Sequence, residues 1–180
     1  MQIKKTEFDG LLILQPKTFI DERGQFFESW NKSVFKNNGL NISFIQDNQS
    51  VSKKNVLRGL HFQNHPHGQG KLVRVSKGSA IDVALDIRKD SITYGKHFKY
   101  KLSDQNATML WIPSGFAHGF ISLEDQTVFQ YKCDALYHRE SEECIKWNDP
   151  FLGIDWGINN PIVSPKDQDG KLFKDVHLIY

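Results

Sequence analysis

The chain has 180 residues, of which 23 are Lys or Arg and 21 are Asp or Glu, so its formal net charge is only +2. A chain of this length can bury a sizeable core, and no linker rich in Pro, Gly or Ser divides it, so we expect one domain over residues 1–180. The basic residues are dispersed rather than gathered in a stripe, which argues against a nucleic-acid partner and favours a small anionic ligand.

The N-terminal segment starts with charged residues, and its apolar run Leu11–Leu14 is too short for a signal peptide or a membrane span. We therefore expect a cytoplasmic protein without membrane contact. Two cysteines, Cys133 and Cys144, are present, and in a chain without an export signal they are expected to be free thiols.

In chain order, most elements read as short strands separated by turn residues. The first two predicted strands are Leu11–Leu14 and Gly24–Glu28. Residues 31–38 are the best helix candidate, because Asn31 can cap the helix N-terminus and Gly39 can take the left-handed conformation that ends a helix. This helix is short, so we expect it to be peripheral.

The remaining strands recur about every ten residues, a spacing typical of an all-β sandwich or barrel. The segment 44–50 is extended and rich in amides and hydroxyls, so it either forms a turn or recognises a ligand. The other predicted strands are Leu57–Gln63, Lys71–Val75, Ser79–Arg88, His97–Leu102, Thr108–Ile112, Phe120–Leu123 and Val128–Asp134.

The segment Val56–Val75 is the strongest candidate for chemistry. Two predicted strands flank a loop with histidines, and Arg58 and Lys71 lie within a few strand residues of His61. A simple hairpin with solvated histidines is the alternative. The grouping of cationic and hydrogen-bonding side chains favours a site for an anionic ligand.

Two further patterns bear on metal binding. The segment Ile112–Phe120 has the Pro-x-Gly-x-x-His spacing of the second half of the cupin motif, a turn that directs its histidine, here His118, into a β-barrel. The first half requires His-x-His followed closely by Glu, but His65 and His67 are followed by Lys71, which would repel a cation. No bound metal is expected.

Strand alternation assigns faces to two more candidate residues. In the segment 79–88, Asp82 lies on the polar face and is either exposed to solvent or lines a pocket. In the last long strand, Phe129, Tyr131 and Cys133 share the face that we expect to point inward. The Tyr131 hydroxyl then needs a partner, or it serves as a proton donor.

Seven motifs carry a resemblance to a known family. They are Asp21-x-Arg23-Gly24-x-Phe26-x-Glu28, Gln46-Asp47-Asn48, Leu57-Arg58-Gly59-Leu60-His61-x-Gln63, Gln69-Gly70-Lys71-Leu72-Val73-Arg74-Val75, Ile112-Pro113-x-Gly115-Phe116-Ala117-His118-Gly119-Phe120, Tyr131-Lys132 and Trp147-Asn148-Asp149-Pro150. In this order, and over nearly the whole chain, they resemble the dTDP-4-dehydrorhamnose 3,5-epimerases. The resemblance implies an all-β, cupin-type barrel (jelly roll) with a few short peripheral helices. It also implies a homodimer with shared N-terminal strands, and catalysis without metal or organic cofactor.

The substrate that the resemblance implies is dTDP-4-keto-6-deoxy-D-glucose, whose C3 and C5 protons are acidic because both carbons adjoin the C4 ketone. Inversion at each carbon gives dTDP-4-keto-L-rhamnose, and it requires a base and an acid on opposite faces of the sugar. By resemblance, His61 is the base, Tyr131 the acid and Lys71 the group that stabilises the enolate. Asp167 is expected to orient His61, with Asp82 as a second supporting carboxylate.

The resemblance also assigns contacts to the rest of the substrate. Arg23 and Arg58 match positions that bind the diphosphate, and Glu28 is expected to come from the partner subunit. The other matching contacts are Gln46, Asp47, Asn48, Lys71, His118, Glu142 and Lys166. In a regular strand Arg58 and His61 would point to opposite faces, so we expect a bulge at Gly59 that lets both reach one ligand.

Three other functions stay open at this stage. The chain could epimerise C3 alone, or it could act on another nucleotide's 4-keto sugar. It could also be a sugar-nucleotide-binding cupin without activity, although such a protein would not need His61 and Tyr131 together.

Overall fold

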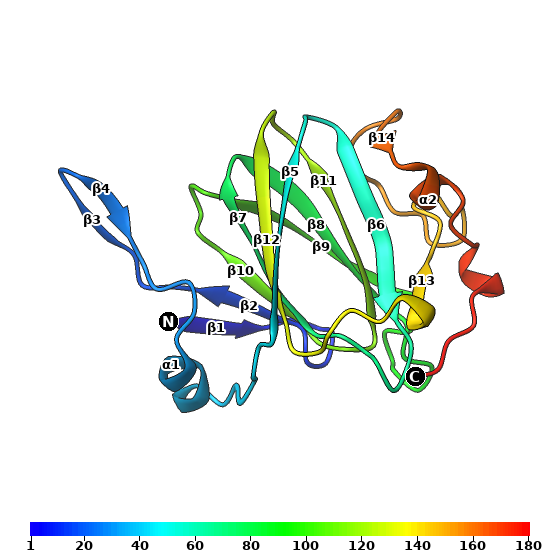
Figure 1. Ribbon diagram of the computed structural model, residues 1–180, viewed down its shortest axis with the longest axis horizontal. Helices are drawn as coiled ribbons and strands as arrows, with labels where there is room; N and C mark the ends of the chain where they lie inside the picture. Colours follow the sequence, from blue (N-terminus) through cyan, green and yellow to red (C-terminus); the bar gives the residue numbers. More distant parts are fainter.

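The computed structural model describes residues 1–180, and two antiparallel sheets packed face to face dominate it (Figure 1). The first sheet has the strand order β1-β2-β10-β7-β12-β5. Its strands are β1 (Gln2–Lys5), β2 (Leu12–Gln15), β10 (Met109–Ile112), β7 (Lys71–Lys77), β12 (Thr127–Cys133) and β5 (Gln46–Ser52).

The second sheet has the order β13-β6-β11-β8-β9, and a short strand β14 pairs with β6 in parallel. Its strands are β13 (Glu142–Cys144), β6 (Val56–Gln63), β11 (Phe116–Ser122), β8 (Ser79–Asp86), β9 (His97–Ser103) and β14 (Ile162–Val163). The mostly-β architecture that the strand spacing predicts is therefore confirmed.

Apolar side chains fill the space between the two sheets. Val73 and Phe129 come from the first sheet and meet Ala84 and Phe120 of the second, and the rings of Phe120 and Phe129 stack at 4.0 Å. The polar and charged residues of the site lie among these strands, so the packed core holds the walls of the site in place.

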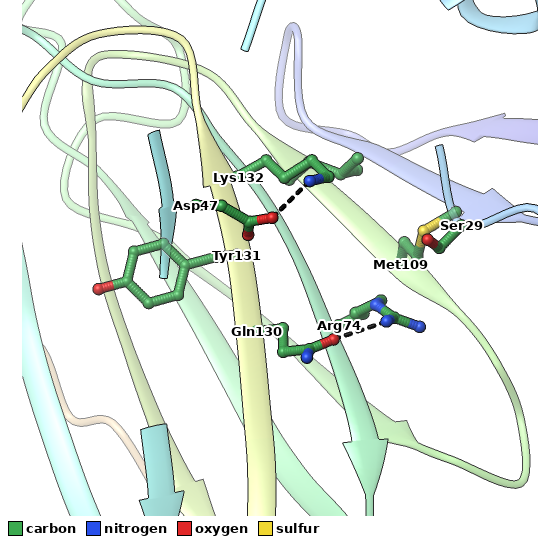
Figure 2. A pocket seen from close by; sticks show the side chains of 8 residues that line it. Ser29, Asp47, Arg74, Met109, Gln130, Tyr131 and Lys132 are labelled. Carbon is green, nitrogen blue, oxygen red and sulfur yellow. Dashed lines mark hydrogen bonds and ion pairs between the residues drawn. The ribbon is translucent and has the colours of Figure 1, made fainter. Parts of the chain in front are cut away.

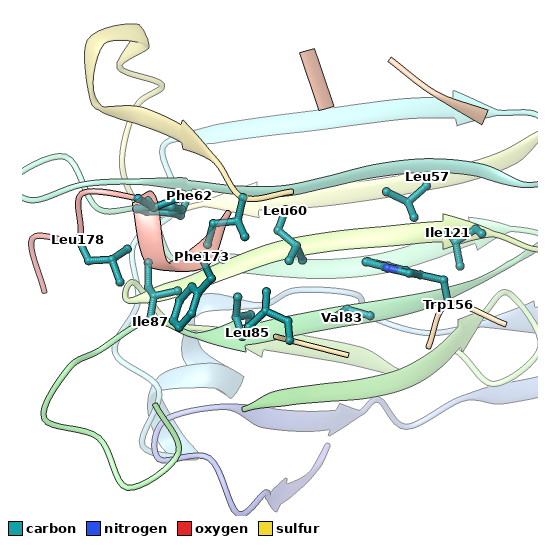
Figure 3. Close-up of a cluster of buried hydrophobic side chains, with 14 residues drawn as sticks. Leu57, Leu60, Phe62, Val83, Leu85, Ile87, Ile121, Trp156, Phe173 and Leu178 are labelled. Atoms are coloured by element: carbon teal, nitrogen blue, oxygen red, sulfur yellow. The ribbon is translucent and has the colours of Figure 1, made fainter. Parts of the chain in front are cut away.

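A second core covers the outer face of the second sheet. Leu57, Leu85 and Ile121 pack there beneath Trp156 and Phe173 of the C-terminal segment, as Figure 3 shows. The second sheet is thus buried on both faces, which explains why β8 carries buried residues along almost its whole length.

The helices are short and peripheral. They are α1 (Lys32–Asn37), α2 (Pro165–Gln168) and the 3₁₀ turns η1 (Arg139–Ser141) and η2 (Phe173–Asp175). The prediction for α1 is confirmed: the Asn31 side chain accepts hydrogen bonds from the N–H groups of Ser33 and Val34, and Gly39 follows with φ +83°. No helix in the structure has the length and apolar character that crossing a membrane requires.

The N-terminal region differs most from the prediction. β1 was not predicted, because its sequence QIKK contains a single apolar residue. The expected strand Gly24–Glu28 is present in shorter form as β4 (Gly24–Phe26), which pairs with β3 (Phe19–Asp21) in a hairpin that projects from the body of the molecule (Figure 1). Its apolar side chains are exposed, and that of Ile20 most of all at 79%.

Candidate active site

A cavity of about 250 Å³ lies between the two sheets and collects half of the predicted site residues. Its lining residues are Gln49, Ser50, Arg58, His61, Lys71, His118, Phe120, Tyr131, Ser164, Lys166 and Asp167. A second hollow of about 310 Å³ shares His61, Lys71 and Tyr131 with it and adds Gln46, Asn48, Phe62, Gln63, Gln69, Tyr137 and Glu142. Because the two hollows share a wall, a ligand longer than either can occupy both.

His61 of β6 and Asp167 of α2 form a hydrogen-bonded pair, with 2.5 Å between Nε2 and Oδ1. Ser164 caps α2 by accepting the Asp167 N–H, and the other Asp167 oxygen accepts the Gly59 N–H at 3.3 Å. Burial opposes ionisation of Asp167, but the hydrogen bond and charge of His61 outweigh it, so the pKa of Asp167 is lowered. When neutral His61 donates from Nε2, its Nδ1 keeps the lone pair that a base needs.

The strand β6 contains the bulge that the sequence predicts at Gly59. His118 of β11 pairs with His61 of β6, and Phe120 of β11 pairs with Arg58 of β6. Two residues of β6 therefore lie opposite a single residue of β11. Gly59 has φ +122°, and a Cβ there would lie 2.5 Å from the Cα of Gly119. The extra residue reverses the alternation, and Arg58 and His61 both line the cavity.

Lys71 and a second His–carboxylate pair add charge to the cavity. The Lys71 ammonium is buried and has one weak hydrogen bond, at 3.5 Å to the His61 carbonyl oxygen. Burial lowers its pKa, and the nearby acidic groups oppose this shift only in part. His118 Nε2 lies 2.7 Å from Asp82 Oδ2, while the other Asp82 oxygen has no partner. Asp82 is fully buried, which excludes the solvent-exposed alternative.

Tyr131 reaches the cavity from β12, in the first sheet. Phe129 and Cys133 are buried on the same side of the strand, as the alternation predicts. Burial raises the pKa of the Tyr131 hydroxyl, which keeps it protonated at neutral pH. His61 and Tyr131 thus enter the cavity from opposite sheets.

The structure does not bring Asp47 into the cavity. Its carboxylate pairs with Lys132 at 2.5 Å and lines a separate hollow with Arg74 and Gln130, while the Tyr131 ring points the other way (Figure 2). Its neighbours in the strand do face the second hollow, where the Gln46 amide donates to Asn48 at 3.1 Å.

Glu142 and Lys166 meet at the rim of the site. One Glu142 oxygen accepts hydrogen bonds from Lys166 at 2.5 Å and from the Tyr137 hydroxyl at 2.8 Å. Burial opposes ionisation of Glu142, but these contacts prevail and lower its pKa. Tyr137 was not predicted as a site residue, because the loop that contains it shows no strand or helix periodicity. Its only sequence signal is an aromatic side chain six positions after Tyr131.

Arg23 and Glu28 lie outside the cavity of their own chain. The Arg23 side chain is 84% exposed at the tip of the β3–β4 hairpin and pairs with Asp21 at 2.6 Å. Glu28 accepts a hydrogen bond from the Asn31 amide and lines a different hollow. A single chain therefore leaves these two predicted contacts unmade.

Both cysteines are free thiols, as predicted. Burial raises the pKa of Cys144 to about 12 and that of Cys133 to about 11, so both are neutral at pH 7. The ring of His67 stacks on His138 at 3.7 Å. Three potential metal ligands, His61, Cys144 and Asp167, lie within 4.8 Å of one another.

Known proteins are similar to this chain over nearly its whole length. A family described as dTDP-4-dehydrorhamnose 3,5-epimerase matches residues 5–175. The enzyme of that name from Methanothermobacter thermautotrophicus is 48% identical over 174 residues, covering 95% of this chain and 94% of the relative.

Solved structures share the whole fold. The dTDP-6-deoxy-D-glucose-3,5-epimerase of Legionella pneumophila, in complex with dTDP-4-keto-L-rhamnose, superposes with a TM-score of 0.93 at 45% identity and covers 98% of this chain and 94% of its own. A 3'-monoepimerase from Streptomyces bikiniensis, in complex with dTDP-quinovose, has a TM-score of 0.88 at 27% identity, with 94% and 86% covered. The fold is the cupin-type β-barrel. By sequence and by structure, the chain belongs to the dTDP-4-dehydrorhamnose 3,5-epimerase family.

Proposed function

We propose that this protein inverts C3 and C5 of dTDP-4-keto-6-deoxy-D-glucose and so forms dTDP-4-keto-L-rhamnose. The observation that carries the proposal is the placement of the His61–Asp167 pair and Tyr131 on opposite walls of one cavity, with the buried Lys71 ammonium nearby. Epimerisation requires this arrangement, because a proton leaves one face of the sugar and another arrives on the opposite face.

In the proposed mechanism His61 removes the proton from C3 or C5, and the electron pair of the broken C–H bond moves into the C4 carbonyl. Asp167 stabilises the imidazolium that forms, as a buried carboxylate does in other acid–base pairs. Lys71 donates to the enolate oxygen, where the negative charge develops. Tyr131 then returns a proton to the other face, and solvent restores both groups to their starting protonation states.

The rest of the substrate has matching groups in the two hollows. Arg58 enters the cavity beside His61 and can bind the diphosphate through its planar guanidinium. Gln46, Asn48 and Tyr137 line the second hollow and can contact the nucleotide. His118, Glu142 and Lys166 complete the proposed ligand contacts.

We also infer that the active form is a homodimer of single-domain subunits, in which the β3–β4 hairpin of one subunit enters the site of the other. The hairpin extends from the body and exposes Phe19, Ile20 and Phe26, which a second copy would cover. Arg23 and Glu28 would then reach the partner's cavity, since neither reaches its own. The proposed dimer is cytoplasmic.

A C3-only epimerase is the second candidate, because the 3'-monoepimerase shares the fold and one base–acid pair serves either one inversion or two. Proton NMR of the product formed from dTDP-4-keto-6-deoxy-D-glucose separates the candidates. Inversion at both carbons is expected. Inversion at C3 alone would support the second candidate, and an unchanged sugar would refute both.

A further inference from the structure

Cys144 lies beside the His61–Asp167 pair, although the proposed mechanism does not use its thiol. In the β13–β6 pairing Cys144 is directly opposite His61. Leu60 and Ile145, the adjacent pair, exchange both backbone hydrogen bonds, at 3.2 and 2.9 Å. The His61–Cys144 pair is therefore a non-hydrogen-bonded pair, the kind in which the facing side chains approach more closely.

Together the three side chains offer an imidazole nitrogen, a sulfur and a carboxylate oxygen, all within 4.8 Å of one another. The Cys144 sulfur lies 3.8 Å from Asp167 Oδ1, the oxygen that contacts His61 Nε2 at 2.5 Å. Tetrahedral Zn²⁺ with bonds of about 2.0–2.3 Å separates its ligand atoms by about 3.3–3.7 Å. The sulfur–oxygen distance is slightly longer than this range and must shorten by a few tenths of an ångström, and the nitrogen–oxygen distance must open by about 1 Å. Side-chain rotation can supply both changes.

We propose that His61, Cys144 and Asp167 form an inhibitory binding site for a soft divalent cation, with Zn²⁺ as the preferred ion. The metal would bind the Cys144 sulfur, displacing the thiol proton to solvent, and His61 Nε2. Occupation of Nε2 moves the ring proton to Nδ1, so His61 loses the lone pair with which it accepts the substrate proton. The inhibition rests on the proposed function, whereas the binding itself does not.

The chemistry of the donors selects the ion. A thiolate with an imidazole suits Zn²⁺ and excludes Mg²⁺ and Ca²⁺, which prefer oxygen ligands. One thiolate and one carboxylate also balance the charge of the cation. Two lysines line the same cavity: the Lys166 ammonium is paired with Glu142 at 2.5 Å, whereas Lys71 has no carboxylate partner and weakens cation binding without occupying the three ligand atoms. The fourth coordination position is left to water or an anion from the cavity.

Binding can be measured directly with Co²⁺, which reports a coordinated thiolate by a near-ultraviolet charge-transfer band. The protein is prepared with a non-thiol reductant and titrated with Co²⁺. The band should appear in the wild type and in Cys133→Ala, the matched control that removes the only other thiol. It should be absent in Cys144→Ala and Cys144→Ser, and the serine variant guards against misfolding of the alanine variant.

Inhibition is then measured by titrating Zn²⁺ into the epimerase assay, with each variant normalised to its own metal-free rate. Loss of an outer-shell group costs about 10–100-fold in metal affinity, so loss of a direct ligand should raise the half-inhibiting Zn²⁺ concentration at least about ten-fold. Cys144→Ala should show this shift, and Mg²⁺ should not inhibit the wild type at the same concentrations.

A cobalt band that persists in Cys144→Ala, or that is missing from the wild type, would overturn the proposal. Equal Zn²⁺ sensitivity of the wild type and Cys144→Ala would overturn its inhibitory part. If the protein had no epimerase activity at all, the cobalt titration would still decide whether the metal site exists. Failure of the site and failure of the proposed function are thus distinguishable.

Discussion

Lys71 holds a positive charge where it costs folding free energy. Its ammonium group is buried with a single hydrogen bond at 3.5 Å, and burial lowers its pKa. A lysine whose folded-state pKa lies below the unfolded value destabilises the protein at neutral pH, and the cost falls only as the pH rises through the folded-state pKa towards the unfolded value near 10.4. The N–H donors of Lys71 that have no partner can bind an enolate oxygen. We therefore attribute the loss of stability to the catalytic role of Lys71.

Replacing Lys71 by Met should therefore separate stability from activity. We expect the free energy of unfolding at pH 7 to rise by about 1–3 kcal/mol, the cost of a buried unsatisfied polar group. Turnover should fall by at least about 10²-fold, the loss seen when one oxyanion donor is removed. Urea denaturation and the product assay measure the two effects. A less stable Met variant would mean that the charge stabilises the fold.

Asp167, unlike Lys71, should stabilise the folded protein, and its contribution should depend on pH. Its folded-state pKa is lowered, so it stabilises the fold above its unfolded value near 3.9, and this stability is lost as the pH falls through the folded-state pKa. In Asp167→Asn the urea midpoint should drop less between pH 6 and the acid range than in the wild type. Equal acid sensitivity of the two proteins would refute a lowered pKa. Turnover of the variant should fall by about 10²-fold or more, because the imidazolium loses its carboxylate.

At the scale of the elements, the β6 bulge decides whether Arg58 and His61 serve one ligand. Two glycines face each other there, and a Cβ on Gly59 would lie 2.5 Å from Gly119 Cα. The two strands cannot easily separate to make room, because β6 and β11 are inner strands of a sheet that is buried on both faces.

Gly59→Ala should therefore cost both stability and function. We expect a loss of about 1–3 kcal/mol or more in the free energy of unfolding, from overpacking and the positive φ, with weaker dTDP binding as Arg58 shifts. The control is Gly157→Ala, whose φ is +74° but whose Cβ would meet nothing within 4 Å. Calorimetry and urea denaturation on both variants separate the clash from the backbone strain. Equal losses in the two would show that the bulge needs no close approach.

The sequence predicts elements well where period-2 alternation is strong, as in β8 and β12, and for β12 the predicted inward face also agrees with the structure. In β8 the apolar face packs under the C-terminal segment, and the face with Ala84 lies between the two sheets. It fails for β1 and β13, which are polar and short and owe their pairing to neighbouring strands. Asp47 shows a second kind of error. Adjacent strand residues point to opposite faces, so Gln46 and Asn48 can face a ligand together but Asp47 cannot join them.

At the scale of the whole molecule, the exposed hairpin requires an explanation that one chain does not contain. Arg23 is 84% exposed, and the site that it is predicted to serve lies elsewhere in the chain. The motif around Arg23 predicts an arginine that contacts the ligand, but it does not predict that Arg23 lies far from the cavity of its own chain. A sequence does not show which subunit a segment contacts. The shared site that we propose would account for both points.

Subunit mixing tests this sharing. Arg23→Ala and His61→Asn should each be nearly inactive alone, because one lacks a diphosphate contact and the other the base. If Arg23 acts on the partner's site, equal mixing after denaturation should restore about a quarter of wild-type activity, since half the dimers are mixed and one site in each is complete. Mixed dimers with no restored activity would place Arg23 in its own subunit's site.

The central claim is that His61 and Tyr131 act on opposite faces of the sugar, and deuterium exchange in D₂O tests it most directly. Tyr131→Phe keeps the ring but removes the acid, so His61 should still abstract the proton and return deuterium to the face it left. NMR should then show deuterium at C3 or C5 with retained configuration and little inverted sugar, whereas His61→Asn should show neither exchange nor inversion. Inversion by Tyr131→Phe at a near wild-type rate, or normal exchange in His61→Asn, would contradict the account.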